Sequence, residues 1–117
     1  MLIICAGPAW TQTAGWKDAA ECAALYHGHY GYETVSFDPA DVSEGWLVMA
    51  DDFTAAAFRL GASEDDIAAS TGRAAWWAQA IQAHIFDNDA ALAQSYVTQQ
   101  SICDGLIGEL PEMASHR

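Results

Sequence analysis

The sequence predicts an α+β fold, with a small sheet of two or three short strands in the N-terminal half packed by four or five helices. Strand-like apolar or alternating runs occur only before residue 50. From residue 51 onward, apolar residues recur at helical spacing between residues that begin or end helices. The chain has 117 residues, 52% of them apolar, so residues 1–117 are expected to form one compact domain around one core.

The first elements are predicted to be a strand and a helix. Residues 2–6 are apolar and meet Gly7 and Pro8, which indicates a short buried strand. Residues 14–26 contain helix formers with apolar spacing, which predicts a helix. The glycine-containing segment 27–32 is predicted to form a turn.

Two further strands are predicted before the helical half. Residues 34–37 alternate between polar and apolar side chains, and residues 46–49 form a short apolar run. The polar segment between them contains Pro39 and Gly45, which favour a loop.

The second half is predicted to be helical. Asp51 or Asp52 can cap a helix through Phe58, and Gly61 can end it in the left-handed conformation. Ser63 can cap a second helix, with Asp66 three residues later as in a capping box. Glu64, Asp65 and Asp66 would then occupy a first turn, where the helix dipole favours negative charge.

Two longer helices are predicted after Gly72. The first ends near Asp87 and has an apolar stripe at helical spacing, formed by Trp77, Ala80, Ile81, His84 and Ile85. The second begins at Asp87 or Asp89 and ends at Pro111, and its apolar positions are Leu92, Tyr96, Cys103, Leu106 and Leu110.

The charge of the chain is strongly unbalanced, with 16 acidic residues, four Lys and Arg, and a formal net charge of −12. Nine of the acids lie between residues 33 and 66, where Arg59 is the only base. This charge repels nucleic acid and anionic membranes, and the single Lys and Arg residues are too scattered to hold phosphates. The sequence therefore predicts a basic protein as partner, and neither nucleic acid nor membrane.

The three cysteines, Cys5, Cys22 and Cys103, have unrelated spacings and no C-x-x-C pair. This pattern favours buried thiols in a reducing compartment over a disulfide framework. The N-terminal run lacks the features of a signal peptide, and no stretch is long enough to span a bilayer. A cytoplasmic location, in a bacterial host cell, is therefore expected.

Few residues in this sequence suggest a catalytic or metal-binding site. His27 and His29, with Cys22 and Glu33 nearby, could offer metal ligands, but the spacing is nonspecific and a second ligand pair is missing. A Cys–His nucleophile pair is equally unsupported, because helix-buried thiols are normally inert. No catalytic residue, metal ligand or cofactor is therefore predicted.

Two segments of the chain resemble parts of known protein families. Residues 60–81 resemble a bacterial helix-turn-helix, with Ala68 and Gly72 at the expected spacing, but Arg73 is their only base and has no basic partner for holding phosphates. Residues 25–56 resemble the opening of small ADP-ribosyltransferase domains, which implies a strand-built NAD pocket with His27 at the ribose. This second resemblance gives the enzyme alternative.

The adjacent Trp76 and Trp77 differ by about 100° around a helix, so at most one can lie at the centre of the core. The other is a candidate interface anchor.

In size, charge and alanine-rich composition, the chain resembles small acidic inhibitors, the anti-CRISPR proteins of phages and prophages and the immunity proteins of nuclease toxins. The resemblance implies a nucleic-acid mimic that blocks the basic groove of a CRISPR effector or similar protein, sterically and electrostatically. Other acidic docking modules remain an alternative. The predicted partner-binding residues are Asp38, Asp41, Glu44, Asp51, Asp52, Glu64, Asp65, Asp66, Trp46, Trp76 and Trp77.

Overall fold

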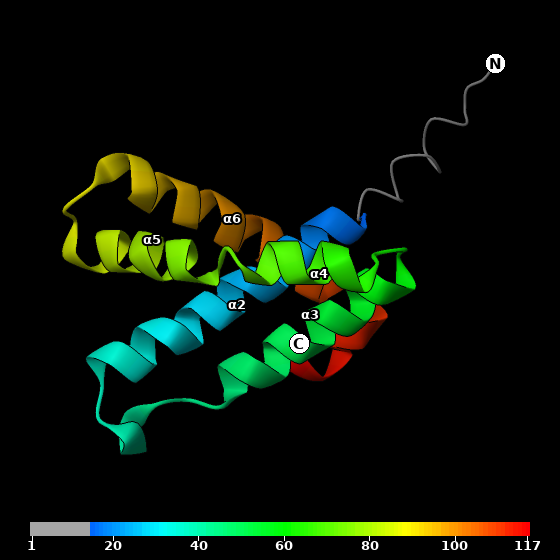
Figure 1. The fold of residues 1–117 in the computed structure, drawn as a ribbon, viewed down its shortest axis with the longest axis horizontal. Helices are drawn as coiled ribbons and strands as arrows, with labels where there is room; N and C mark the ends of the chain where they lie inside the picture. Colours follow the sequence, from blue (N-terminus) through cyan, green and yellow to red (C-terminus); the bar gives the residue numbers. More distant parts are fainter. Residues whose placement is uncertain (1–14) are drawn as a thin grey trace.

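The computed structural model describes residues 15–117, and every regular element in this part of the chain is a helix (Figure 1). The predicted strand over residues 2–6 lies outside the described residues. The elements, in chain order, are α2 (Trp16–Ser36), the 3₁₀ helix η2 (Pro39–Asp41), α3 (Gly45–Arg59), α4 (Glu64–Thr71), α5 (Ala74–Phe86), α6 (Ala90–Glu109) and the 3₁₀ helix η3 (Pro111–His116).

Helix α2 is the centre of the bundle and packs against α3, α4, α5 and α6. It is therefore buried on more than one side, and five consecutive residues, 22–26, are buried. Four alanines lie among its buried positions. Small side chains there let several helices approach α2 closely, and the larger Leu25, Phe53 and Met113 fill the core between them.

The predicted α+β fold is wrong, because no strand occurs in residues 15–117 and the segments expected to be strands are helical. Residues 34–36 are the last turn of α2, and residues 46–49 belong to α3. Trp46 and Met49 contact the same core as Ala50 and Phe53, so the apolar run has helical spacing once it is continued past Asp51. Tertiary packing of this face outweighs the strand propensity of the short run.

The predicted turn over residues 27–32 is also wrong, because these residues lie inside α2. Gly28 marks the closest approach of α2 to α5. A Cβ atom at Gly28 would lie 2.7 Å from Trp77 Cβ and 3.0 Å from the carbonyl oxygen of Ala74. This glycine is therefore required by packing between helices, whereas a turn would have required its conformational freedom.

The predicted helix start at Asp51 or Asp52 is wrong, because α3 already begins at Gly45 and both residues lie inside it. The other helix ends of the second half follow the predicted signals. Gly61 has a positive φ of 115° just after α3, and Ser63 and Asp66 form a complete capping box at the start of α4. Asp87 ends α5 in the left-handed conformation, and the side chain of Asp89 accepts a hydrogen bond from the backbone of Leu92 at the start of α6. The stripe on α5 is confirmed for Trp77, Ala80 and Ile81, which are buried, but His84 and Ile85 are exposed.

A disulfide joins Cys22 of α2 to Cys103 of α6, and both residues are fully buried. The expectation of separate thiols is therefore wrong for these two cysteines. The helices place the two Cα atoms 5.7 Å apart, within the usual range for a disulfide. A sequence separation of 81 residues gives no local pattern from which the pairing could be predicted. Cys5 lies outside the described residues.

Candidate functional site

Three of the predicted partner-binding acids lie together on the acidic connection, which we define as residues 37–44 between α2 and α3. Asp38, Asp41 and Glu44 are all exposed. The connection is held in place by a hydrogen bond from the backbone N–H of Ser43 to the carboxylate of Glu33, at 2.8 Å. Its backbone also makes the η2 turn, in which the N–H of Asp41 donates to the carbonyl of Asp38.

Asp51 and Asp52 lie further along α3 and have different surroundings. Asp51 is exposed, whereas Asp52 lies 2.7 Å from the Nε2 atom of His116. This contact links α3 to η3 at the C-terminal end of the chain. Asp52 therefore has a partner within the fold.

The acidic triplet at residues 64–66 begins α4, as predicted. Asp66 accepts a hydrogen bond from the backbone N–H of Ser63, and the Ser63 hydroxyl accepts one from the N–H of Asp66. The start of α4 and the acidic connection lie at opposite ends of the long axis (Figure 1). The predicted acids are therefore divided between separate places and do not converge on one surface.

The three arginines of the described chain bind groups outside the acidic connection and do not neutralise its carboxylates. Arg59 forms two hydrogen bonds with Glu112, and these lower the pKa of that carboxyl group. Arg73 pairs with Glu21, and Arg117 donates to the backbone carbonyls of Ile107 and Leu110. Within residues 15–117, no ion pair includes Asp38, Asp41 or Glu44.

The predicted tryptophans have three different environments. Trp77 is buried in the core, whereas Trp76 keeps 38% of its surface exposed. This difference confirms that only one of the adjacent indoles lies in the core. Trp46 is half-buried, and its ring stacks on His29 with 4.2 Å between ring centroids.

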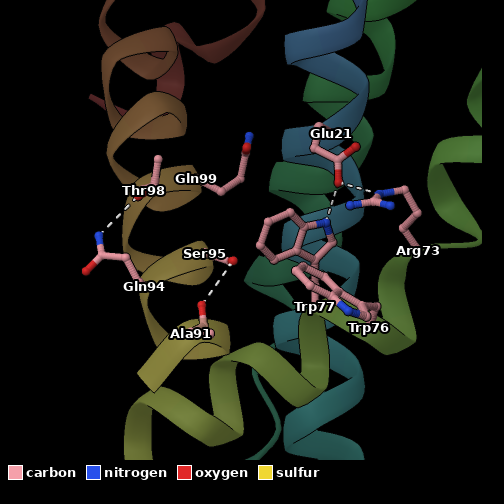
Figure 2. Close-up of a pocket in the computed structure, with 9 residues that line it drawn as sticks. All are labelled: Glu21, Arg73, Trp76, Trp77, Ala91, Gln94, Ser95, Thr98 and Gln99. Carbon is pink, nitrogen blue, oxygen red and sulfur yellow. Dashed lines mark hydrogen bonds and ion pairs between the residues drawn. The ribbon is translucent and has the colours of Figure 1, made fainter. Parts of the chain in front are cut away.

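An open groove of about 550 Å³ lies between α6 on one side and α2 with the start of α5 on the other (Figure 2). We call it the α5–α6 groove. The Glu21 carboxylate lies on the α2 side of the groove, where one oxygen accepts hydrogen bonds from Arg73 Nε at 2.8 Å and from the Trp77 indole N–H. The lining residues are Glu21, Arg73, Trp76, Trp77, Ala91, Gln94, Ser95, Thr98 and Gln99.

Only the two tryptophans of this groove were among the predicted site residues. The sequence does contain a signal for Glu21, which is a carboxylate within the alanine-rich, largely buried part of α2. A partly buried carboxylate requires a partner, and Arg73 supplies it from 52 residues away. The partner itself could not be predicted from a single sequence.

His29 is held within a cluster of aromatic and amide side chains. Its ring stacks with both Tyr26 and Trp46, which also stack with each other, and its Nε2 lies 3.2 Å from the Gln100 side-chain oxygen. Burial lowers the pKa of His29, and the hydrogen bond with Gln100 and the charge of Glu33 only partly oppose this effect. The folded protein therefore favours the neutral imidazole.

The lowered pKa of His29 predicts a loss of stability in acid. Because the unfolded chain binds this proton first, near the ordinary pKa of 6.5, the free energy of unfolding should fall as pH drops below that value. A His29→Phe variant lacks this contribution. The stability difference between wild type and variant, measured by urea unfolding from about pH 7.5 to about pH 5.5, should therefore shift in favour of the variant. A difference that stays constant across this range would contradict the prediction.

The cysteines and histidines considered for catalysis or metal binding do not form such a site within residues 15–117. Cys22 and Cys103 form the disulfide, so neither is a free thiol for a nucleophile pair. In the described part of the chain, no group of three His, Cys, Asp or Glu side chains is placed to hold a metal ion.

The ADP-ribosyltransferase resemblance implied strands that this fold lacks over residues 15–117. Residues 34–37 and 46–49 are not strands, and His27 is half-buried on α2. The helix-turn-helix resemblance covers α4 and the first part of α5, which are joined by Gly72 and Arg73. There Arg73 pairs with Glu21.

None of the helices in residues 15–117 is both long and apolar enough to cross a membrane. No family model matches this chain, and no curated protein or solved structure matches it either.

Proposed function

We propose that this protein is a non-catalytic docking module that binds a basic surface of another protein through the acidic connection. The observation that supports this proposal most directly is the exposure of Asp38, Asp41 and Glu44 without counter-charges among the described residues. Carboxylates held on one short connection can pair with Lys and Arg of a partner, and complementary potentials speed the encounter.

Apolar side chains beside the acids supply contact area for the same partner. Val35 is 88% exposed at the end of α2, and Phe37, the first residue of the acidic connection, is 44% exposed. Phe37 also packs edge-on against Tyr32, which restrains its ring. An interface with exposed apolar anchors and charged neighbours is typical of protein–protein recognition.

The other predicted acids contribute less to this proposal because the fold already uses several of them. Asp66 completes the capping box of α4, and Asp52 contacts His116. Glu64 and Asp65 lie in the first turn of the same helix, where the dipole favours them. Trp77 is buried and offers almost no surface to a protein partner.

The disulfide influences which basic partner we propose. Buried disulfides are typical of oxidising compartments and are rare in cytosolic proteins. The Cys22–Cys103 bond therefore favours a location outside the cytoplasm over the cytoplasmic one expected from the cysteine spacing. It also favours a basic extracytoplasmic protein over an intracellular CRISPR effector, although the same electrostatic mechanism would serve both.

Charge reversal on the acidic connection is expected to weaken partner binding by at least about tenfold, which corresponds to about 1.4 kcal/mol. The test compares the wild type with an Asp38→Lys, Asp41→Lys, Glu44→Lys variant in crosslinked pull-downs followed by mass spectrometry. The wild type should retain proteins of high isoelectric point, and retention should fall as salt rises. Affinity for the retained protein is then measured with each variant.

A matched control is the Glu64→Lys, Asp65→Lys variant, which leaves Asp66 in its capping box. It changes the net charge in the same direction at the opposite end of the molecule and should bind nearly as well as the wild type. Equal weakening by both variants would indicate an effect of net charge alone. Retention that is insensitive to salt, or retention of acidic partners, would refute the proposed electrostatic docking.

A further inference from the structure

The α5–α6 groove carries no net charge in a molecule whose formal charge is −12. Glu21 and Arg73 are its only charged residues, and they pair with each other. The remaining lining residues are two indoles, two amides, two hydroxyls and one alanine. A ligand of this groove is therefore selected by hydrogen bonding and shape.

Both donors and acceptors remain free along the groove walls. In the described structure, the two Nη nitrogens of Arg73 make no hydrogen bond, because only its Nε contacts Glu21. Gln94 donates through its nitrogen to Thr98, and Gln99 directs its nitrogen toward the disulfide sulfurs, so both amide oxygens remain available as acceptors. The second oxygen of Glu21 is a further acceptor, and the Thr98 hydroxyl can still donate.

The indoles give this polar groove an apolar surface. Trp76 is 38% exposed and meets Trp77 edge to face, with 4.8 Å between ring centroids. The Arg73 guanidinium lies 5.4 Å from the centre of the Trp76 ring, which restrains the indole. Figure 2 shows both indoles and Arg73 across the groove from Gln94 and Thr98 of α6.

We propose that the α5–α6 groove binds a neutral saccharide. Each sugar hydroxyl both donates and accepts hydrogen bonds, which matches a wall that offers both kinds of group. The apolar C–H face of a sugar ring can pack against an exposed indole. The volume of about 550 Å³ lies within the usual range for small-molecule sites and accommodates a disaccharide.

Charged ligands fit the groove less well. The net charge of the protein repels anions, and Arg73 is already neutralised by Glu21. The same ion pair removes the charge with which Glu21 could attract a cation. This proposal is independent of the acidic connection, which lies between α2 and α3.

The test is a nuclear magnetic resonance titration of the intact, oxidised protein with maltose, cellobiose and N,N′-diacetylchitobiose at millimolar concentrations. We expect at least one of these saccharides to shift the indole N–H signals of Trp76 and Trp77 and the side-chain amides of Gln94 and Gln99. Trp76→Ala and Gln94→Ala should each weaken that binding by about tenfold. Because Gln94 is exposed on α6, its variant keeps the test valid even if the Trp76 variant unfolds.

Gln82→Ala is the matched control, because Gln82 is an exposed amide on α5 that does not line the groove. It should bind the saccharide as the wild type does. The proposal is overturned if none of the three saccharides shifts the groove signals, or if the shifts map to another face. It is equally overturned if adenosine or benzoate shifts these signals and the saccharides do not.

Discussion

Replacing Cys22 and Cys103 together by alanine is expected to lower the free energy of unfolding by about 4 kcal/mol. The disulfide closes a loop across a sequence separation of 81 residues. The loss of loop-closure entropy in the unfolded chain corresponds to about 4.5 kcal/mol for a loop of this length, and measured effects of native disulfides are about 2–5 kcal/mol. Small domains are typically stable by only about 5–15 kcal/mol, so the bond supplies a large share of the total.

Urea unfolding with and without dithiothreitol measures this effect. The reduced wild type should unfold near the same urea concentration as the Cys22→Ala, Cys103→Ala variant, and the reductant should leave that variant unchanged. The variant acts as its own control for any unrelated effect of the reductant. Equal stability of oxidised and reduced wild type would show that the bond does not constrain the unfolded chain as expected.

Replacing Gly28 by alanine is expected to destabilise the fold by about 1–3 kcal/mol, the usual effect of adding a methyl group to a closely packed core. The new Cβ would lie 2.7 Å from Trp77 Cβ and within 3.1 Å of backbone atoms of Ala74 and Ala78. None of these atoms is the end of a flexible side chain, so α2 and α5 must separate to accept it. Thermal unfolding measures the change.

Gly31→Ala is the matched control, because Gly31 lies on the same helix about one turn later and a Cβ atom there would have no neighbour within 4 Å. Alanine is favoured over glycine inside a helix by about 0.5–1 kcal/mol, so this variant should be slightly more stable than the wild type. The two substitutions are thus expected to have opposite signs. Destabilisation by both variants to the same extent would contradict the close-approach explanation.

Helix ends were the features that could be predicted best from the sequence. The capping box at Ser63 and the turn at Gly61 depend on the chemistry of a few neighbouring residues. The same holds for Asp89, whose side chain accepts a hydrogen bond at the start of α6. Local signals of this kind do not depend on the arrangement of the bundle.

The strands were predicted wrongly because their signals were short and their helical packing was not visible locally. Residues 46–49 resemble a strand by themselves, and only their continuation to Phe53 gives helical spacing. Gly28 and Gly31 suggested a turn, but α2 tolerates both because it packs against four other helices. Whether these segments form strands, a turn or helices depends on tertiary contacts that a single sequence does not reveal.

The two candidate sites differ in the same way, because one is determined by neighbouring residues and the other by residues far apart in the sequence. Exposure of Asp38, Asp41 and Glu44 could be predicted from the loop composition around Pro39. The α5–α6 groove could not be predicted, because it needs Glu21 of α2, Arg73 before α5 and the amides of α6 to meet. The pairing of Cys22 with Cys103 depends on the same arrangement of helices.

The buried disulfide also determines what a protease could do to this molecule. The exposed acidic connection lies in the chain between Cys22 and Cys103, so a cut there leaves two pieces that are still covalently linked. The pieces also remain packed through α2, which contacts several helices that follow the cut in sequence. Backbone cleavage at the proposed docking surface would therefore produce a nicked protein held together as one covalent unit until the bond is reduced.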